Sequence, residues 1–333
     1  MRKIKKKERE LTRKRTALFV FYGILALILV GVGWRIYASL KTSVWDGRNR
    51  INLVFRSKPL FIASLEPSEA VMNLLVVPDG TFIEAAHGYG PYRVEVIYSL
   101  GELEGKGEML LADSLQEYLG VPLDAYVSPD KKELIIDNFN NTVKIKTQIL
   151  GTMMGLFKGE GKTNLTRWDL LRLWWETVRL KNNKINVVNL NETSASSEAT
   201  LPDGTKATKI EPERLDRIVN RLFVDEKIRA EDLTLAVLNS TGKSGLANQG
   251  ARVIANIGGR VVKVGEIEGM TGIGKCQIRS EEKYRETYTV RKIREIFDCQ
   301  WSREKIEGQR TEMVIILAED YWQKLYAPLS SSE

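Results

Sequence analysis

An uncharged stretch near the start of the chain constrains its fold more than any other feature. Residues 17–34 read "ALFVFYGILALILVGVGW", 18 residues without a charged side chain. At a rise of about 1.5 Å per residue, a helix of this length nearly crosses a hydrocarbon core of roughly 30 Å, and Arg35 extends it by snorkelling. A buried core helix normally keeps a polar face, which this stretch lacks. We therefore predict a transmembrane helix over residues 17–40.

A basic segment precedes the apolar stretch and predicts its orientation. Residues 1–16 hold nine Lys and Arg and two Glu, which accounts for the whole net charge of +7. By the positive-inside rule this short tail lies in the cytoplasm, where it also favours anionic lipid, and the chain after residue 41 lies outside. A cleaved signal peptide is the alternative, but "WRIYASLKTS" matches its cleavage site only weakly. The prediction is a single-pass protein of the cell membrane with an extracytoplasmic body.

The remainder of the chain is electrically balanced. From Ala17 onward there are 41 basic residues (50 less 9) and 41 acidic residues (43 less 2). The isoelectric point of about 9.2 therefore describes the tail rather than a groove for nucleic acid. No nucleic-acid partner is expected.

Gly242, Lys243 and Ser244 lie between an apolar run and an amphipathic run, as in a phosphate-binding loop. A Walker loop needs another glycine five residues before Gly242, and that position is Val237. The compartment outside a membrane also normally lacks ATP. We therefore interpret Gly242 and Gly245 as turn residues and expect no ATP.

Hydrophobic patterning predicts two domains outside the membrane. The first, residues 43–190, is expected to be α/β. Its expected elements are strands at 52–55, 59–66, 71–78, 121–127, 133–137 and 143–150, a helix at 109–119 ending at Gly120, and a helix capped by Thr166 with Asp169. Residues 191–231 are expected to be a polar linker or long hairpin loop followed by a connecting helix.

The second domain, residues 232–327, alternates between strand and helix patterns. Its expected elements are strands at 233–238, 260–267, 277–279 and 313–317 and helices at 246–257 and 288–298. This alternation indicates a small α/β or α+β sandwich.

Isolated residues that could carry chemistry are also compatible with structural roles. His87, the only histidine, lies in "EAAHGYGPYR" without an evident partner, so we expect a structural role rather than a general base. Leu171, Trp174 or Trp175, and Val178 repeat at helical spacing. We expect this apolar stripe to pack, although a tryptophan pair could also stack on a ligand.

Two cysteines, Cys276 and Cys299, bracket an expected strand and helix of the second domain. A strand followed by an antiparallel helix returns the chain close to its start, so a bridge is geometrically possible, and an oxidising compartment favours it. Such a bridge would close a loop of about 24 residues and stabilise the fold by roughly 3 kcal/mol. Two buried thiols are the alternative, and we predict the disulfide.

The second domain resembles the LytR C-terminal domain found in envelope proteins of the LytR-CpsA-Psr family. The resemblance rests on "VLNSTGKSGLANQGARVI" and on "MVIILAEDYW", and it covers residues 233–322. The order of membrane anchor, first domain, "LPDGT" segment and this module agrees with it.

The first domain resembles the catalytic domain of the same family. "RSKPLFIASLEP" corresponds to that family's Arg-Ser-Asp-Thr strand, and "LVVPDGTFIEAAHGYG" to its Pro-Arg-Asp-Thr turn and Gly-rich loop. "YRVEVIYSLG" falls at its Lys-Ile-Asn segment, and "LQEYLGVPLDAYV" matches its helix and Gly-Ile-Pro run. The resemblance implies an α/β fold and a phosphotransferase that moves glycopolymer from a polyprenyl pyrophosphate to the cell wall.

That chemistry needs carboxylates for Mg²⁺ and arginines for the pyrophosphate, and this chain departs from the pattern. The metal-side aspartate falls on Lys58, the turn arginine on Asp79 and the next aspartate on Gly80. A later Arg-x-Arg segment has no counterpart. A protonated lysine cannot ligate Mg²⁺, so we expect the transferase activity to be lost, unless a shifted register restores Asp79 as a metal ligand.

The expected function is therefore non-catalytic. The chain would bind lipid-linked glycan or wall polymer, or would scaffold envelope proteins, without metal or cofactor. Arg56, Lys58 and Arg93 are the candidate phosphate-binding residues. The alternative is an Mg²⁺-dependent phosphotransferase, and a regulatory anchor is a third class that the short tail makes weaker.

Overall fold

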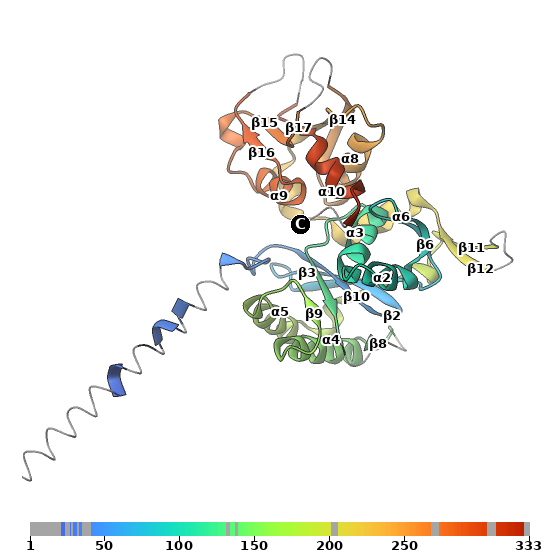
Figure 1. Cartoon of the computed structure of the whole chain (residues 1–333), viewed down its shortest axis with the longest axis vertical. Coiled ribbons are helices and arrows are strands. Elements are labelled where there is room, and N and C mark those ends of the chain that lie inside the picture. The colour runs from blue at the N-terminus through green and yellow to red at the C-terminus, as the bar shows by residue number, and fades with distance from the viewer. Residues whose placement is uncertain are drawn as a thin grey trace, which may run out of the picture.

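The computed structural model describes most of the chain as two α/β units (Figure 1). The described ranges are 41–130, 134–136, 139–200, 206–267, 273–304 and 311–329, with positions 21–23, 27, 29–31 and 33–34 before them.

The predicted transmembrane helix, like the basic tail, lies largely outside the described residues. Its few described positions are helical, and their large apolar side chains are exposed, from 58% at Tyr22 to 73% at Leu27. Within the described parts of the chain, no helix is both long and apolar enough to span a bilayer. The transmembrane helix stays a prediction.

A six-stranded sheet forms the centre of the first unit. Its order is β10, β4, β3, β1, β7, β9, where β1 pairs antiparallel with β3 and parallel with β7, and β10 pairs parallel with β4. Because β3 is antiparallel to both of its neighbours, β1, β4, β7 and β10 all run the same way. The strands are β1 (Ile51–Phe55), β3 (Leu60–Glu66), β4 (Val71–Val77), β7 (Ala125–Ser128), β9 (Lys162–Thr163) and β10 (Ile185–Asn189).

Helices cover both faces of this sheet, which explains why its strands read as nearly continuous apolar runs. In β1 every residue is buried, with Leu53 and Phe55 in the core on one face and Val54 in the core on the other. The first face packs against α4 (Thr142–Phe157) and α5 (Arg167–Arg179). The second packs against α2 (Val94–Glu102), α3 (Gly107–Leu119) and α6 (Pro212–Phe223).

Smaller elements complete the first unit. These are the paired strands β2 (Ser57–Lys58) with β8 (Leu134–Ile135), β5 (Phe82–Ala85) with β6 (Gly90–Arg93) and β11 (Ser196–Thr200) with β12 (Lys206–Ile210), and the 3-10 turns η1 (Asn182–Lys184) and η2 (Leu190–Glu192). The segment at 191–231 thus contains a hairpin, the connecting helix α6 and the short α7 (Glu226–Glu231).

The strand predicted at residues 143–150 is wrong, because this segment is part of α4. Asn141 caps the helix by accepting a hydrogen bond from the Lys144 amide. Ile145 and Ile149 are both buried, but a spacing of four fits a strand and a helix equally well. Val143, which a buried strand would turn inward, is 56% exposed. The buried positions of the helix continue to Met153 and Leu156 at helical spacing.

The predicted helix at Thr166 is confirmed, but its packing face is not the one expected. Thr166 and Asp169 form a reciprocal capping box at the start of α5. The buried apolar residues are Leu170 and Leu173, with Trp174 packed against the same core. The predicted stripe of Leu171, Trp175 and Val178 instead points to solvent.

The second unit is a five-stranded sheet whose order is β14, β13, β17, β15, β16. The predicted strands are confirmed as β13 (Thr234–Asn239), β14 (Arg260–Glu266), β15 (Gln277–Ser280) and β17 (Met313–Leu317), and the predicted helices as α8 (Leu246–Asn256) and α9 (Tyr288–Phe297). The sequence did not predict β16 (Gln300–Ser302), η3 (Glu282–Tyr284) or α10 (Glu319–Tyr326).

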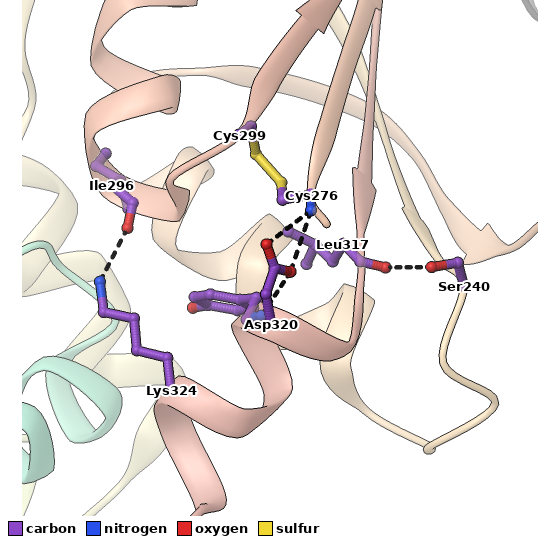
Figure 2. The surroundings of a disulfide bond; sticks show 8 residues. Ser240, Cys276, Ile296, Cys299, Leu317, Asp320 and Lys324 are labelled. Carbon is purple, nitrogen blue, oxygen red and sulfur yellow. Dashed lines mark hydrogen bonds between the residues drawn. A yellow bond between two sulfur atoms is a disulfide. The ribbon is translucent and has the colours of Figure 1, made fainter. Parts of the chain in front are cut away.

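The predicted disulfide between Cys276 and Cys299 is present, with a Cα–Cα distance of 4.4 Å (Figure 2). It joins the chain just before β15 to the chain just before β16. The Asp320 carboxylate of α10 accepts hydrogen bonds from the amides of Cys276 and Tyr321, so the bridge and the last helix support each other (Figure 2).

The two units are joined by polar contacts as well as by the chain. Arg252 of α8 forms an ion pair with Asp216 of α6 and donates to the carbonyl of Glu117 in α3. Asn256 donates to the carbonyl of Gly120, whose φ of 63° ends α3. A Cβ at Gly120 would lie 2.9 Å from the Asn256 amide nitrogen, so this close approach requires glycine.

The chain after α10 returns to the first unit. Leu329 is buried among the core residues of α2, α3 and α6, and Lys106 donates a hydrogen bond to its carbonyl. The second unit is therefore held to the first at both of its ends.

Candidate anion-binding site

A cleft of about 160 Å³ lies at the carboxyl ends of β1 and β4, where α2 begins. In open α/β sheets, ligands commonly bind outside the carboxyl ends of the parallel strands. The residues that line the cleft are Arg56, Ser57, Lys58, Leu60, Asp79, Val94, Glu95, Tyr98, Ser99 and Leu111.

Two of the three predicted phosphate-binding residues, Arg56 and Lys58, meet in this cleft. Arg56 follows β1 directly, and Lys58 lies in the short β2 with its side chain exposed. The third residue, Arg93, is not among the lining residues. It occupies the N-cap position of α2 without a side-chain capping bond, and its guanidinium lies 3.9 Å from the Glu95 carboxylate.

Arg56 is held in place but not saturated with hydrogen bonds. Its Nη2 donates to the carbonyl of Pro129 at 3.0 Å, and its guanidinium lies 4.1 Å from the centre of the Tyr98 ring. Its Nε is buried and has no hydrogen-bond partner. A buried donor without an acceptor is costly, and an acceptor on a bound anion would satisfy it.

A network of charges behind the cleft fixes Tyr98. The Tyr98 hydroxyl donates to Glu108 at 3.0 Å, and Lys162 lies 3.4 Å from Glu108 and 3.1 Å from Glu102. Burial, followed by the hydrogen bond to Glu108, raises the pKa of Tyr98 above its ordinary value. The ring therefore stays neutral and presents its face to Arg56.

The first two amides of α2 are bonded within the protein. The amide of Val94 donates to the carbonyl of Thr81, and the amide of Glu95 donates to the carbonyl of Asp79. These bonds hold the turn after β4 against the helix. The side-chain cations of the cleft, and not these two amides, are therefore the donors that an anion could reach.

The cleft offers few groups that ligate magnesium. Asp79 and Glu95 are its only lining carboxylates, and Lys58 brings a positive charge to the same space. In the part of the chain that the structure describes, no three His, Cys, Asp or Glu residues come together as a metal site. A Cβ at Gly80 would approach Thr208 of the β11–β12 hairpin, so position 80 faces that hairpin.

His87 lies outside the cleft, and the structure gives it two partners that were not evident from the sequence. Its Nδ1 lies 2.8 Å from the carbonyl of Ala327 and its Nε2 lies 2.9 Å from the Asp113 carboxylate. Burial by itself lowers the pKa of His87, but these two acceptors raise it above the ordinary value overall. The protonated ring can donate to both acceptors and so ties the returning chain to the first unit.

Lys243 is part of a turn, as predicted, and it is paired. Its Nζ lies 2.8 Å from Glu319 and 3.0 Å from the centre of the Trp322 ring. Gly242 and Gly245 have φ values of 69° and 91°, which only glycine adopts freely.

Comparisons with known proteins match this chain to solved structures of low sequence identity. No model of a known protein family matches the sequence, and no curated protein matches it either. The solved structure of TagV from B. subtilis is 14% identical, with a TM-score of 0.38, over 53% of this chain and 96% of that chain. YwtF (TagT), titled a LytR-CPS2A-psr family protein with bound octaprenyl pyrophosphate lipid, is 15% identical, with a TM-score of 0.38, over 54% and 91%. Lin1025 from Listeria innocua is 10% identical, with a TM-score of 0.37, over 53% and 97%.

Proposed function

We propose that this chain is a membrane-anchored, extracytoplasmic protein of the cell envelope that binds the phosphate groups of a lipid-linked glycan or wall polymer without transferring them. The observation that carries the proposal is the state of Arg56. Its guanidinium stacks on Tyr98 at the mouth of a small cleft, and its buried Nε lacks an acceptor. A phosphate oxygen would supply that acceptor, and Lys58 would add a second positive charge.

The size of the cleft limits what it can hold. Pockets for whole small molecules occupy roughly 300–1,000 Å³, against about 160 Å³ here. The cleft accommodates a charged head group, while a polyprenyl chain and a glycan would extend beyond it. The proposal therefore concerns recognition of phosphate or pyrophosphate.

The lysine beside the two carboxylates of the cleft supports the binding of phosphate rather than its transfer. Phosphoryl transfer requires stabilisation of the charge that develops on the transferred group, commonly by a metal ion held by carboxylates. In this cleft Lys58 brings a positive charge beside the two carboxylates of Asp79 and Glu95, which opposes the binding of such an ion. We assign the second unit to contacts with envelope proteins or wall polymer, a role that agrees with the resemblance of its sequence to the LytR C-terminal domain.

An Mg²⁺-dependent phosphotransferase is the second candidate, and one observation favours it. Asp79, the carboxylate that a shifted alignment would make a metal ligand, lines the same cleft as Arg56 and Lys58. Its backbone position is fixed by the bond from the Glu95 amide.

A titration of the full chain in detergent with a polyprenyl pyrophosphate, with and without Mg²⁺, tests both candidates. Thermal stability and released phosphate are measured on the same samples. Stabilisation without Mg²⁺ and without release is expected, and the Arg56→Ala variant should lose it. Arg260→Ala, an exposed arginine of the second unit, is the matched control. Release of phosphate that depends on Mg²⁺ and disappears in Asp79→Ala would establish the enzyme instead.

A further inference from the structure

The outer surface of α4 and α5 carries large apolar side chains that stay exposed in the described part of the chain. On α5, Leu171 is 46%, Trp175 is 55% and Val178 is 39% exposed. On the neighbouring α4, Met154 is 40% and Phe157 is 42% exposed. We call this surface the α4–α5 face. It lies on the side of the first sheet away from the second unit (Figure 1).

Two shallow grooves adjoin the same face. One, of about 410 Å³, is lined by Trp168, Leu171, Arg172 and Trp175 together with the segment at residues 46–48. The other, of about 380 Å³, continues past Arg48 to Arg179. Indole rings beside arginines are typical of surfaces that lie at the boundary between lipid and water.

The chain that leads out of the predicted membrane helix is fastened to the start of α5. The side chain of Ser43 and the amides of Val44 and Trp45 all donate to the Asp169 carboxylate, the amides at 3.1 and 3.4 Å. Arg172 donates to the carbonyl of Trp45 at 2.8 Å. The position of α5 relative to residue 43 is therefore fixed.

This attachment places α5 close to the bilayer. The predicted transmembrane helix ends at residue 40, and three chain steps separate residue 40 from Ser43. At no more than about 3.6 Å per step, Ser43 lies within roughly 11 Å of the end of the membrane helix. The first turn of α5 is one side-chain contact beyond it, through the bond to Asp169. Trp175 lies six residues further along α5, which at 1.5 Å per residue adds only about 9 Å.

Charge separates this layer from the rest of the body. Residues 141–184, which form α4, α5 and the segments beside them, hold nine Lys and Arg and three Asp and Glu, a net charge of +6. From Ala17 onward there are 41 residues of each sign, so the chain outside residues 1–16 and 141–184 holds 32 basic and 38 acidic residues, a net charge of −6 (41 less 9, and 41 less 3). A positive layer beside a membrane anchor is attracted to anionic lipid head groups.

We propose that the α4–α5 face lies on the outer surface of the membrane and inserts Leu171, Trp175 and Val178 among anionic phospholipids. This inference rests on the membrane anchor of the proposed function and not on its ligand. The occupant of the face is the lipid surface itself, because the tether brings it within reach, the layer is basic, and the exposed side chains suit the interface. The first unit then lies against the bilayer instead of hanging from a flexible stalk.

A fluorescent label at position 178 tests the inference in the full chain. Both native cysteines form the disulfide, so Val178→Cys provides a single reactive thiol. Val262→Cys, on an exposed strand of the second unit, is the control. Each labelled chain is reconstituted into vesicles that contain phosphatidylglycerol, and vesicle flotation is measured first. Quenching by head-group-proximal spin-labelled lipid and by aqueous iodide is then compared.

The label at position 178 should be quenched by the lipid probe roughly threefold more than the label at 262, and it should be shielded from iodide. Arg179→Glu should weaken this lipid quenching, whereas Arg260→Glu should not. If the chain floats but both labels respond alike to iodide, the inference is wrong and the anchor stands. Shielding from both quenchers would mean that protein, such as a second copy, covers the face, which also overturns it. A chain that fails to float contradicts the anchor, and the inference falls with it.

Discussion

The two units present the carboxyl ends of parallel strands in opposite ways. In the first unit, the ends of β1 and β4 leave a cleft in which the Nε of Arg56 has no acceptor. In the second, the turn after β13 is closed: Lys243 is paired with Glu319 and covered by Trp322, and Ser240 donates to the carbonyl of Leu317. The comparison shows that a glycine-rich turn with a lysine does not make an anion site. The Arg56 cleft differs in offering a cation with an unsatisfied donor, and for this reason we propose it as the anion site.

The largest expected effect is on the stability of the second unit when its disulfide is removed. Replacing Cys276 and Cys299 by serine should lower the free energy of unfolding by about 3 kcal/mol, because the unfolded chain regains the entropy of an open loop. Urea unfolding, followed by tryptophan fluorescence with and without reductant, measures this loss. Reductant should not change the double variant, and equal stability of the two chains would show that the bridge does not hold the second unit together.

The junction between the units should be sensitive to pH through Glu117. Burial, as the main cause, raises the pKa of its carboxyl to about 7 from 4.5, and Tyr321 and Tyr326 of α10 lie near it. A carboxyl with a raised pKa stabilises the fold fully below pH 4.5, and this stabilisation is lost as the pH rises through 7.

The Glu117→Gln variant removes that titration. It should exceed the unmodified chain in stability by roughly 2–3 kcal/mol at pH 8 and should differ little below pH 4.5. Thermal unfolding across this pH range measures the difference. A smaller loss of stability with rising pH should remain in the variant, because the raised pKa of His87 acts in the same direction. Parallel curves for the two proteins would contradict a buried carboxyl at this site.

The third test removes Arg56 and Lys243 separately and compares the effects on ligand binding. Arg56→Ala should weaken the binding of a polyprenyl pyrophosphate by about tenfold or more, since a hydrogen bond to a charged group contributes about 1.5–3 kcal/mol. Lys243→Ala should leave that affinity unchanged. Isothermal titration of both variants provides the comparison, and Arg56→Lys, which keeps the charge but not the fork of donors, should fall between them. Equal losses in the two alanine variants would mean that the cleft is not the binding site.

The smallest effect is expected for the stability of the Lys243→Ala variant itself. The pair with Glu319 is more than one-third exposed on both sides, so solvent screens it, and its loss together with the contact to Trp322 should cost no more than about 1 kcal/mol. Thermal unfolding checks this. A loss comparable to that of the disulfide variant would show that the turn after β13 is a central support of the second unit.

Much of the fold could be predicted from local patterns, and the failures have identifiable causes. The strand "PLFIASLE" and the helix that ends at Gly120 are recognisable because apolar runs and terminating turns agree. The segment at 143–150 was predicted as a strand although it is helical, because its two buried isoleucines are four residues apart. That spacing fits both the strand and the helix period. The packing of the exposed apolar stripe on α5 was predicted wrongly, because apolar residues at helical spacing indicate an apolar face but not what that face contacts.

Only part of the candidate site could be predicted from the sequence. Arg56 and Lys58 were identified because they lie in a segment that resembles a known family. Tyr98, which fixes Arg56, was not identified, since it lies 42 positions away and reaches the cleft only after α2 has packed against the sheet. No local pattern relates one aromatic residue in a helix to one arginine after a strand.

The return of the chain to the first unit has a mechanical consequence. Because α6 leads into the second unit and Leu329 is buried beneath α2 and α3 after leaving it, the second unit is gripped at both ends by the same body. A force on the second unit therefore acts on two attachments at once, and neither attachment can detach without exposing core residues. Tension applied to the second unit would therefore pass into the first unit without a free hinge in between.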